Sequence, residues 1–202
     1  MEFLPVALAY LGAHWIEDLG FSTTLIGIWL TTRRSMLCWP LILIANLCYL
    51  VVLAHAFLLS SALLQFAYMA FTLYGWWHWA RGKREEGEVR LVPLGQRGLF
   101  LGLCAGVAGS LLLGWLMAHT GASLVYLDAA LASFSVLATW WQVRKHRANW
   151  WLWIAVDLLY IAEYLTKKLY LTSLLYVCLV LLAVLGLRSW KNASMAESRP
   201  AA

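Results

Sequence analysis

Residues 150–164 read WWLWIAVDLLYIAEY and combine aromatic rings with a carboxylate inside an apolar segment. Positions 150, 153, 157, 160 and 164 hold Trp, Trp, Asp, Tyr and Tyr. Steps of three and four residues place these side chains on one face of a helix. Such a face offers stacking surfaces and one negative charge, which suits a flat, polar solute that contains a ring. An ionisable group in a membrane-type helix is costly, so Asp157 marks a functional site.

The same pattern occurs 111 residues earlier, where the corresponding residues are Trp39, Asn46 and Tyr49. Without a gap, this register also pairs Glu17 with Asp128, Trp29 with Trp140, Arg33 with Arg144, Gly75 with Gly186 and Trp79 with Trp190. Chance could align a few tryptophans, but it would not also match arginine, tyrosine and glycine. We interpret residues 17–79 and 128–190 as an internal repeat.

The composition is that of an integral membrane protein. Of the 202 residues, 63% are hydrophobic and 12% are charged, whereas a soluble domain has about 25% charged residues. The net charge of +5 comes from basic residues between hydrophobic segments, where they set orientation in a membrane, so nucleic acid is not an expected partner. Four cysteines lie at 38, 48, 104 and 178 without metal-ligand spacing, and no metal site is expected.

The hydrophobic segments predict an all-α protein with seven transmembrane helices. Residues 1–14 are too short to cross the bilayer, because a span needs about 20 residues, and are expected to form an interfacial helix. A first three-helix repeat covers 15–80, a cytoplasmic loop 81–97, a linker helix 98–120 and a second three-helix repeat 121–190. The polar tail 191–202 is expected to be disordered.

The distribution of positive charge predicts the orientation. If the N-terminus is outside, all 15 Lys and Arg residues except Lys167 and Lys168 lie on the inner side. The positive-inside rule therefore gives an N-out, C-in protein. One linker helix between two triplets makes the repeats parallel, in a 3+1+3 arrangement. Parallel repeats are a transporter design with the substrate site between the repeats, near the midplane.

The repeat also predicts the depth of the polar groups. Trp39 and Trp150 follow basic inner loops and are expected at the inner membrane interface. Asn46 and Asp157 are expected roughly 10 Å further into the membrane than these tryptophans, and Tyr49 and Tyr160 roughly 15 Å further. The candidate substrate-binding residues are Trp39, Asn46, Tyr49, Gln65, Tyr68, Asp128, Trp150, Trp153, Asp157, Tyr160 and Tyr176.

Structural explanations compete for several of these residues. Trp39 and Trp150 could be interfacial anchors, and Asn46 could bond two helices together. The carboxylate of Asp128 also suits the start of a helix. Outside the candidate set, Glu163 and Lys167 have the i, i+4 spacing of a local ion pair.

Enzymatic chemistry has no support in the sequence. There is no Walker A motif, no Ser/His/Asp or HExxH arrangement and no lysine inside the seventh helix for a Schiff base. We therefore expect no catalytic residues and no cofactor. A membrane partner protein that does not transport stays open as an alternative, although matched polar stripes in both repeats favour a carrier.

Several strings resemble the PnuC family of bacterial nicotinamide riboside transporters. They are Trp39-Pro40 with Asn46 and Tyr49; Leu64-Gln65 with Tyr68; YGWWHW at 74–79; Asp128; NWWLWIAVD at 149–157; and LYLTSLLY at 169–176. The resemblance covers about residues 15–190. It implies a seven-helix fold similar to that of SWEET sugar transporters, and a homotrimer surrounded by lipid in the bacterial inner membrane. It also implies facilitated diffusion of the riboside, trapped by a cytoplasmic kinase.

The chemistry of nicotinamide riboside fits the stripe. Its pyridinium ring is a flat cation, so Trp150 or Tyr160 would stack on it, Asp157 would favour its charge, and Asn46 and Gln65 would bond its carboxamide or ribose. Relatives of this family carry thiamine, riboflavin or deoxynucleosides, and thiamine is also a flat cation. Glu163, which could bind an aminopyrimidine, and Gln142 stay outside the riboside pattern. Coupling to protons also stays open.

Overall fold

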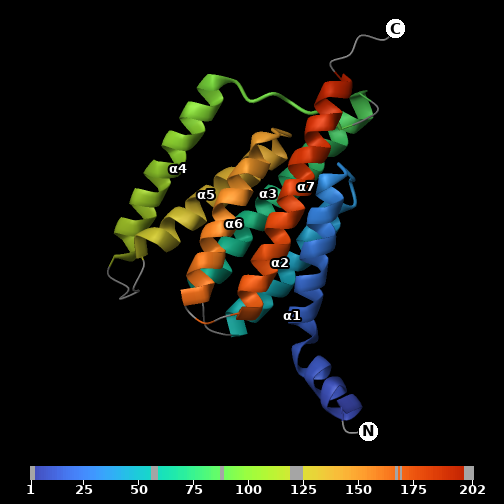
Figure 1. The fold of residues 1–202 in the computed structure, drawn as a ribbon, viewed down its shortest axis with the longest axis vertical. Coiled ribbons are helices and arrows are strands. Elements are labelled where there is room, and N and C mark those ends of the chain that lie inside the picture. The colour runs from blue at the N-terminus through green and yellow to red at the C-terminus, as the bar shows by residue number, and fades with distance from the viewer. Residues whose placement is uncertain are drawn as a thin grey trace. The chain divides into compact units, whose positions relative to one another are not determined.

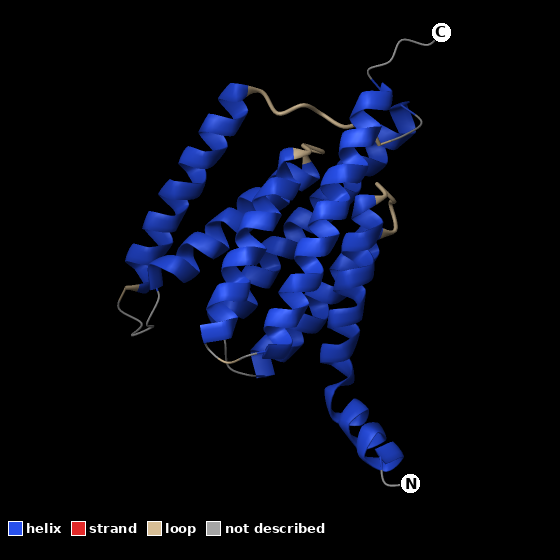
Figure 2. Ribbon diagram, viewed as in Figure 1, coloured by secondary structure: helices blue, strands red, loops and turns tan. Residues whose placement is uncertain are grey.

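The computed structural model describes residues 3–55, 59–86, 89–118, 125–166, 168 and 170–197. This part of the chain is helical throughout, with loops between the helices (Figure 2), which confirms the all-α class. Its seven helices are α1 (Phe3–Thr32), α2 (Cys38–His55), α3 (Leu59–Glu86), α4 (Gln96–Met117), α5 (Val125–Val143), α6 (Ala148–Thr166) and α7 (Tyr170–Glu197), as Figure 1 shows.

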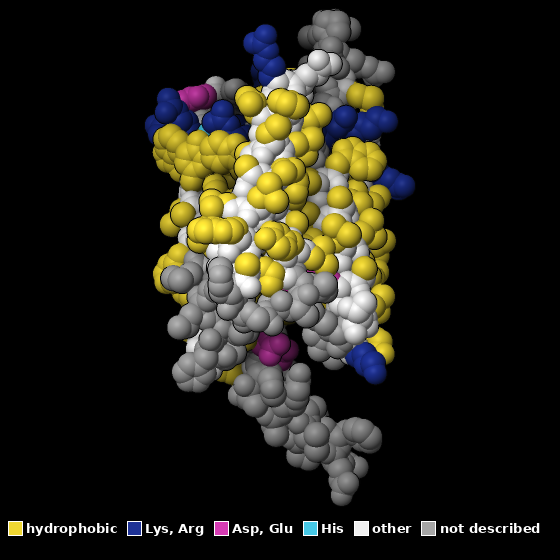
Figure 3. Space-filling model, turned by 90° about the vertical axis from the view of Figure 1, so that its left-hand side faces the viewer, with side chains coloured by type: hydrophobic (Ala, Val, Ile, Leu, Met, Phe, Trp, Pro, Cys, Tyr) yellow, Lys and Arg dark blue, Asp and Glu magenta, His cyan; other side chains and the backbone are white. Residues whose placement is uncertain are grey.

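Three of these helices have the length and composition needed to cross a membrane. They cover Cys38–His55, Gln96–Met117 and Thr172–Met195, with mean hydropathies of 1.9, 2.0 and 1.9. Helices such as α6 carry the tryptophans, tyrosines and carboxylates of the predicted site, and these residues lower the mean hydropathy. Along α4 the hydrophobic side chains face outward (Figure 3), among them Phe100, Leu101 and Trp115. A surface of this kind suits lipid.

Three boundaries differ from the expectations. The residues expected as an interfacial helix and as the first crossing form one helix, α1. The loop expected from residue 81 starts later, because α3 continues to Glu86. A disordered tail is expected from residue 191, but residues 191–197 continue α7.

The chain forms two compact units, residues 1–77 and 78–202, and α3 continues from one into the other. In the first unit α1 packs on α2. In the second unit α4 packs on α5, α5 on α6, and α6 on α7.

Four buried tryptophans organise the packing of these helices. In the first unit the ring of Trp39 lies on the backbone of Gly75, and in the second the ring of Trp150 lies on Gly186. A Cβ atom at either glycine would overlap the indole, so glycine is required for the close approach. In the second unit Trp190 packs edge-on against Trp150, with 5.4 Å between ring centroids. Trp79, in the C-terminal third of α3, donates from Nε1 to the Val143 carbonyl oxygen at 3.0 Å.

Two helix-to-helix turns share one geometry. After α1, Arg34 has φ 56° and its backbone N–H donates to the Thr31 carbonyl oxygen. After α5, Lys145 has φ 62° and its backbone N–H donates to the Gln142 carbonyl oxygen. These positions differ by 111 residues, the offset of the sequence repeat. Just before each turn a guanidinium group lies over a tryptophan ring, Arg33 over Trp29 at 4.6 Å and Arg144 over Trp140 at 5.6 Å.

Candidate functional site

Three tyrosines of the second unit form a stacked group, called here the tyrosine cluster: Tyr160 and Tyr164 on α6 and Tyr176 on α7. The ring centroid of Tyr176 lies 4.7 Å from the ring centroid of Tyr160 and 5.3 Å from that of Tyr164. The two α6 rings are 5.9 Å apart and nearly parallel, as the i, i+4 spacing requires. The cluster therefore presents aromatic surface from two helices at one place.

Asp157 lies one helical turn before Tyr160 and is 3% exposed. It is close enough to Tyr176 for its charge to act on the phenol. Among the residues described, Asp157 forms no hydrogen bond or ion pair. A buried carboxylate without a partner is costly, so this position needs a ligand cation, a hydrogen-bond donor or a proton.

The corresponding position in the first unit is satisfied within the protein. The Asn46 side-chain amide donates to the Thr72 hydroxyl at 3.1 Å, and Thr72 donates to the Tyr68 carbonyl oxygen at 2.8 Å. In the repeat register the counterpart of Thr72 is Ala183, which has no hydroxyl. The second unit therefore keeps the polar position of the first but lacks the group that would pair with it.

The structure brings together some of the predicted site residues and separates others. Asp157, Tyr160 and Tyr176 meet in the second unit, and Asn46 and Tyr68 share a hydrogen-bond chain in the first. Tyr49 lies against Gly20 of α1, and Gln65 is half-buried on α3.

The predicted tryptophans have mainly packing contacts. Trp39 and Trp150 are almost fully buried against glycines. Trp153 donates to the Gln142 side-chain oxygen at 3.3 Å, which gives Gln142 a structural role between α5 and α6. Asp128 is half-buried in the first turn of α5.

Two members of this arrangement are absent from the predicted set. Tyr164 lies on the same helical stripe as Asp157 and completes the tyrosine cluster, so the stripe itself contained the signal. Thr72 could have been found by asking which repeat pairs exchange a polar residue for an apolar one. Glu163 is buried on α6, and its expected partner Lys167 lies outside the described residues. Across the described ranges no group of three or more His, Cys, Asp or Glu side chains could hold a metal ion.

Comparisons with known proteins give a consistent result. The family model described as nicotinamide mononucleotide transporter matches residues 14–192. The nicotinamide riboside transporter PnuC of Escherichia coli is 23% identical over 217 residues, covering 95% of this chain and 91% of that protein. The riboflavin/roseoflavin transporter RibM of Streptomyces davaonensis is 30% identical over 195 residues, covering 92% and 89%.

The fold is also similar to that of a solved structure. A crystal structure of the vitamin B3 transporter PnuC superposes with a TM-score of 0.78 at 21% sequence identity. The match covers 96% of this chain and 88% of that one. Together with the apolar helices, these similarities identify a multi-pass membrane protein.

Proposed function

This chain belongs to the nicotinamide mononucleotide transporter family, and from that membership we propose that it carries nicotinamide riboside across the bacterial inner membrane. The E. coli relative is a transporter of that riboside. We propose passive transport by facilitated diffusion, made one-way by a cytoplasmic kinase that phosphorylates the product. No catalytic step is assigned to the chain itself.

The observation that carries the proposal is the unpaired carboxylate beside the tyrosine cluster. Nicotinamide riboside has a flat, positively charged pyridinium ring. Tyrosine faces attract a desolvated cation by about 2 kcal/mol, and Asp157 supplies the opposite charge at the same place. We therefore assign Tyr160 and Tyr176 to stacking on the base and Asp157 to its charge.

The other predicted residues are proposed as supporting contacts. Asn46, Gln65, Tyr49 and Tyr68 offer hydrogen bonds and ring edges that suit a carboxamide or ribose. We propose that Trp39, Trp150, Trp153 and Asp128 act mainly by holding their helices in place, because the three tryptophans already pack or bond within the protein.

We propose seven crossings in a 3+1+3 arrangement of parallel repeats, N-out and C-in, with three chains in the assembly. The shared turn geometry at Arg34 and Lys145 supports the repeat, since unrelated turns have no reason to match at the repeat offset. The clustering of Lys and Arg in the segments assigned to the inner side supports the orientation.

Riboflavin is the second candidate substrate, because the relative with 30% identity is a riboflavin/roseoflavin transporter. Its flat ring system would also stack on the tyrosine cluster. Riboflavin is neutral, however, and gains nothing from a carboxylate charge. The role of Asp157 therefore separates the two candidates.

The test is uptake of labelled riboside, riboflavin and thiamine by proteoliposomes that contain only the purified chain. We expect saturable riboside uptake that falls at least tenfold in Asp157→Asn, since one unit charge is lost at a buried site. Glu85→Gln, an exposed carboxylate on α3, is the control and should leave uptake unchanged. Riboflavin uptake that survives Asp157→Asn would move the substrate to riboflavin.

Three further outcomes bear on the substrate, the class of protein and the coupling mode. Thiamine uptake without riboside uptake would keep the fold and move attention to Glu163, a second buried carboxylate on α6. Absence of flux for all three solutes in sealed proteoliposomes would contradict the carrier and favour a partner protein. A response of uptake to an imposed pH gradient would contradict passive diffusion.

A further inference from the structure

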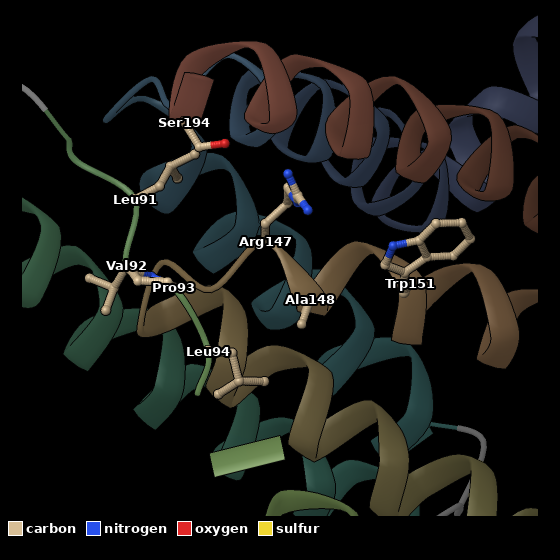
Figure 4. Close-up of a pocket in the computed structure, with 8 residues that line it drawn as sticks. All are labelled: Leu91, Val92, Pro93, Leu94, Arg147, Ala148, Trp151 and Ser194. Carbon is tan, nitrogen blue, oxygen red and sulfur yellow. The ribbon is translucent and has the colours of Figure 1, made fainter. Parts of the chain in front are cut away.

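A cavity of ≈ 540 Å³ lies in the second unit (Figure 4), and no residue of the tyrosine cluster is among its lining residues. It is bounded by the connector that follows α3, the first turn of α6 and the last turns of α7. Its lining residues are Leu91, Val92, Pro93, Leu94, Arg147, Ala148, Trp151 and Ser194. Nothing in the proposed transport chemistry uses this cavity.

The connector wall is held in place by hydrogen bonds. The Val92 backbone N–H donates to the Lys145 carbonyl oxygen at 3.1 Å. The His146 ring donates from Nδ1 to the Val92 carbonyl oxygen at 2.9 Å. Both bonds join the connector to the turn between α5 and α6, so the wall is fixed relative to Arg147, which follows that turn directly.

The polar groups of the cavity suit an anion. Arg147 is exposed and, in the described part of the chain, its guanidinium forms no hydrogen bond or ion pair. Figure 4 shows it between Ser194 of α7 and Trp151 of α6. Among the described residues, the lining contains no carboxylate. Ala148 opens α6, where the helix dipole is positive.

The remaining walls are apolar. Leu91, Val92, Pro93 and Leu94 line one side, and the ring of Trp151, which is 62% exposed, lines the other. A small hydrated anion gains nothing from such walls. A molecule with a phosphate at one end and hydrocarbon at the other matches both parts of the cavity.

The two anchoring residues are not part of the repeated framework. In the 111-residue register Arg147 corresponds to Met36 and Trp151 to Pro40. The turn geometry is the same in both units, so neither an arginine nor a tryptophan is needed at these positions to build it. The pair is therefore available for a role that only the second unit has.

We propose that this cavity binds the headgroup of an anionic glycerophospholipid, with the phosphate on Arg147 and the glycerol and first acyl carbons against Leu94 and Trp151. Arginine binds phosphate through several parallel N–H donors. Tryptophan and basic residues mark the membrane interface, and basic pockets between helices there bind anionic headgroups. The leaflet is cytoplasmic under the proposed orientation, and the site is independent of which solute is carried.

The test is lipid binding by the purified full-length protein in detergent, followed by native mass spectrometry. Phosphatidylglycerol, phosphatidylcholine and glycerol 3-phosphate are titrated separately. We expect phosphatidylglycerol to bind most tightly and Arg147→Gln to weaken it about tenfold. Arg147→Lys should weaken it less, and Arg84→Gln, an exposed charge on α3 outside the cavity, should leave it unchanged.

Three results would overturn the proposal. Equal binding of phosphatidylglycerol and phosphatidylcholine would mean that the cavity does not discriminate between anionic and zwitterionic headgroups. Glycerol 3-phosphate that displaces the lipid at equal concentration would assign the site to a soluble phosphate. Unchanged lipid binding in Arg147→Gln would place the lipid elsewhere. If that variant does not fold, Trp151→Leu is measured in its place, and unchanged lipid binding in Trp151→Leu would likewise place the lipid elsewhere.

Discussion

Replacing Gly186 by alanine tests the packing that holds α6 on α7. A Cβ atom at this position would lie 2.5 Å from Cζ2 and 2.6 Å from Cδ2 of Trp150. The indole has little space to retreat, because it is 1% exposed and lies edge-on against Trp190. The ring would have to move by about 1 Å to restore ordinary van der Waals separation.

The expected cost follows from two opposing effects. Alanine is better than glycine inside a helix by about 1 kcal/mol. Overpacking a filled core costs about 1–3 kcal/mol, and a confined indole places this site in the upper part of that range. We expect a net loss of about 1–2 kcal/mol, with a midpoint lowered by about 2–4 °C for each kcal/mol.

The measurement is thermal unfolding of the purified protein in detergent, followed by tryptophan fluorescence. Gly95→Ala is the matched control, since nothing lies within 4 Å of a Cβ at that position. Gly75→Ala should resemble Gly186→Ala, because Trp39 covers Gly75 in the same way. The double change Gly186→Ala with Trp150→Leu should cost less than the sum of its parts, because the smaller side chain makes room.

A Gly186→Ala protein as stable as the unaltered chain would refute this reasoning. It would show that the indole moves freely and that the glycine is not needed for the approach of the helices. A fully additive double change would refute the direct contact in a second, independent way.

Three further changes test single contacts. Thr72→Val removes the acceptor of the Asn46 amide without changing volume and should lower stability by about 1 kcal/mol in the same unfolding assay. Trp79→Phe leaves the Val143 carbonyl without its donor and should cost about 1–2 kcal/mol, measured in the same way. Tyr176→Leu should weaken riboside binding about tenfold in a fluorescence titration while its unfolding midpoint stays near that of the unaltered chain.

Each of these predictions has its own contradicting result. An unchanged midpoint in Thr72→Val would mean that Asn46 finds another acceptor. An unchanged midpoint in Trp79→Phe would mean that water replaces the indole at Val143. Full riboside affinity in Tyr176→Leu would remove the tyrosine cluster from the proposed site.

The helices could be predicted from hydropathy, but their ends could not. Hydropathy marks where apolar sequence stops, and that is where the bilayer ends, not where the helix ends. The residues after Trp79 are good helix formers, and Arg81 pairs with Glu85 at 2.9 Å, so α3 continues into polar sequence. α7 likewise continues past Lys191 into polar sequence, to Glu197.

The candidate site was predictable in part. Spacing alone placed Asp157 on one face with Tyr160 and Tyr164, and both of these rings belong to the tyrosine cluster with Tyr176. The same spacing included Trp150, whose ring packs on Gly186 instead. The repeat register matched tryptophan with tryptophan and glycine with glycine, but a register pairs equivalent positions and does not say which residues touch.

The end of α3 has a consequence for how the protein is made. Trp79 belongs to the second unit, where its N–H meets Val143 and its ring lies 6.0 Å from that of Trp190. Chains are synthesised from the N-terminus, so this tryptophan is made long before either partner exists. Until α5 arrives its N–H has no Val143 carbonyl to meet, and the core closes only when α7 brings Trp190. A gene split at the connector would leave Trp79 on the N-terminal fragment. Two co-expressed halves would then assemble only if Trp79 packed against Val143 and Trp190 of the other fragment.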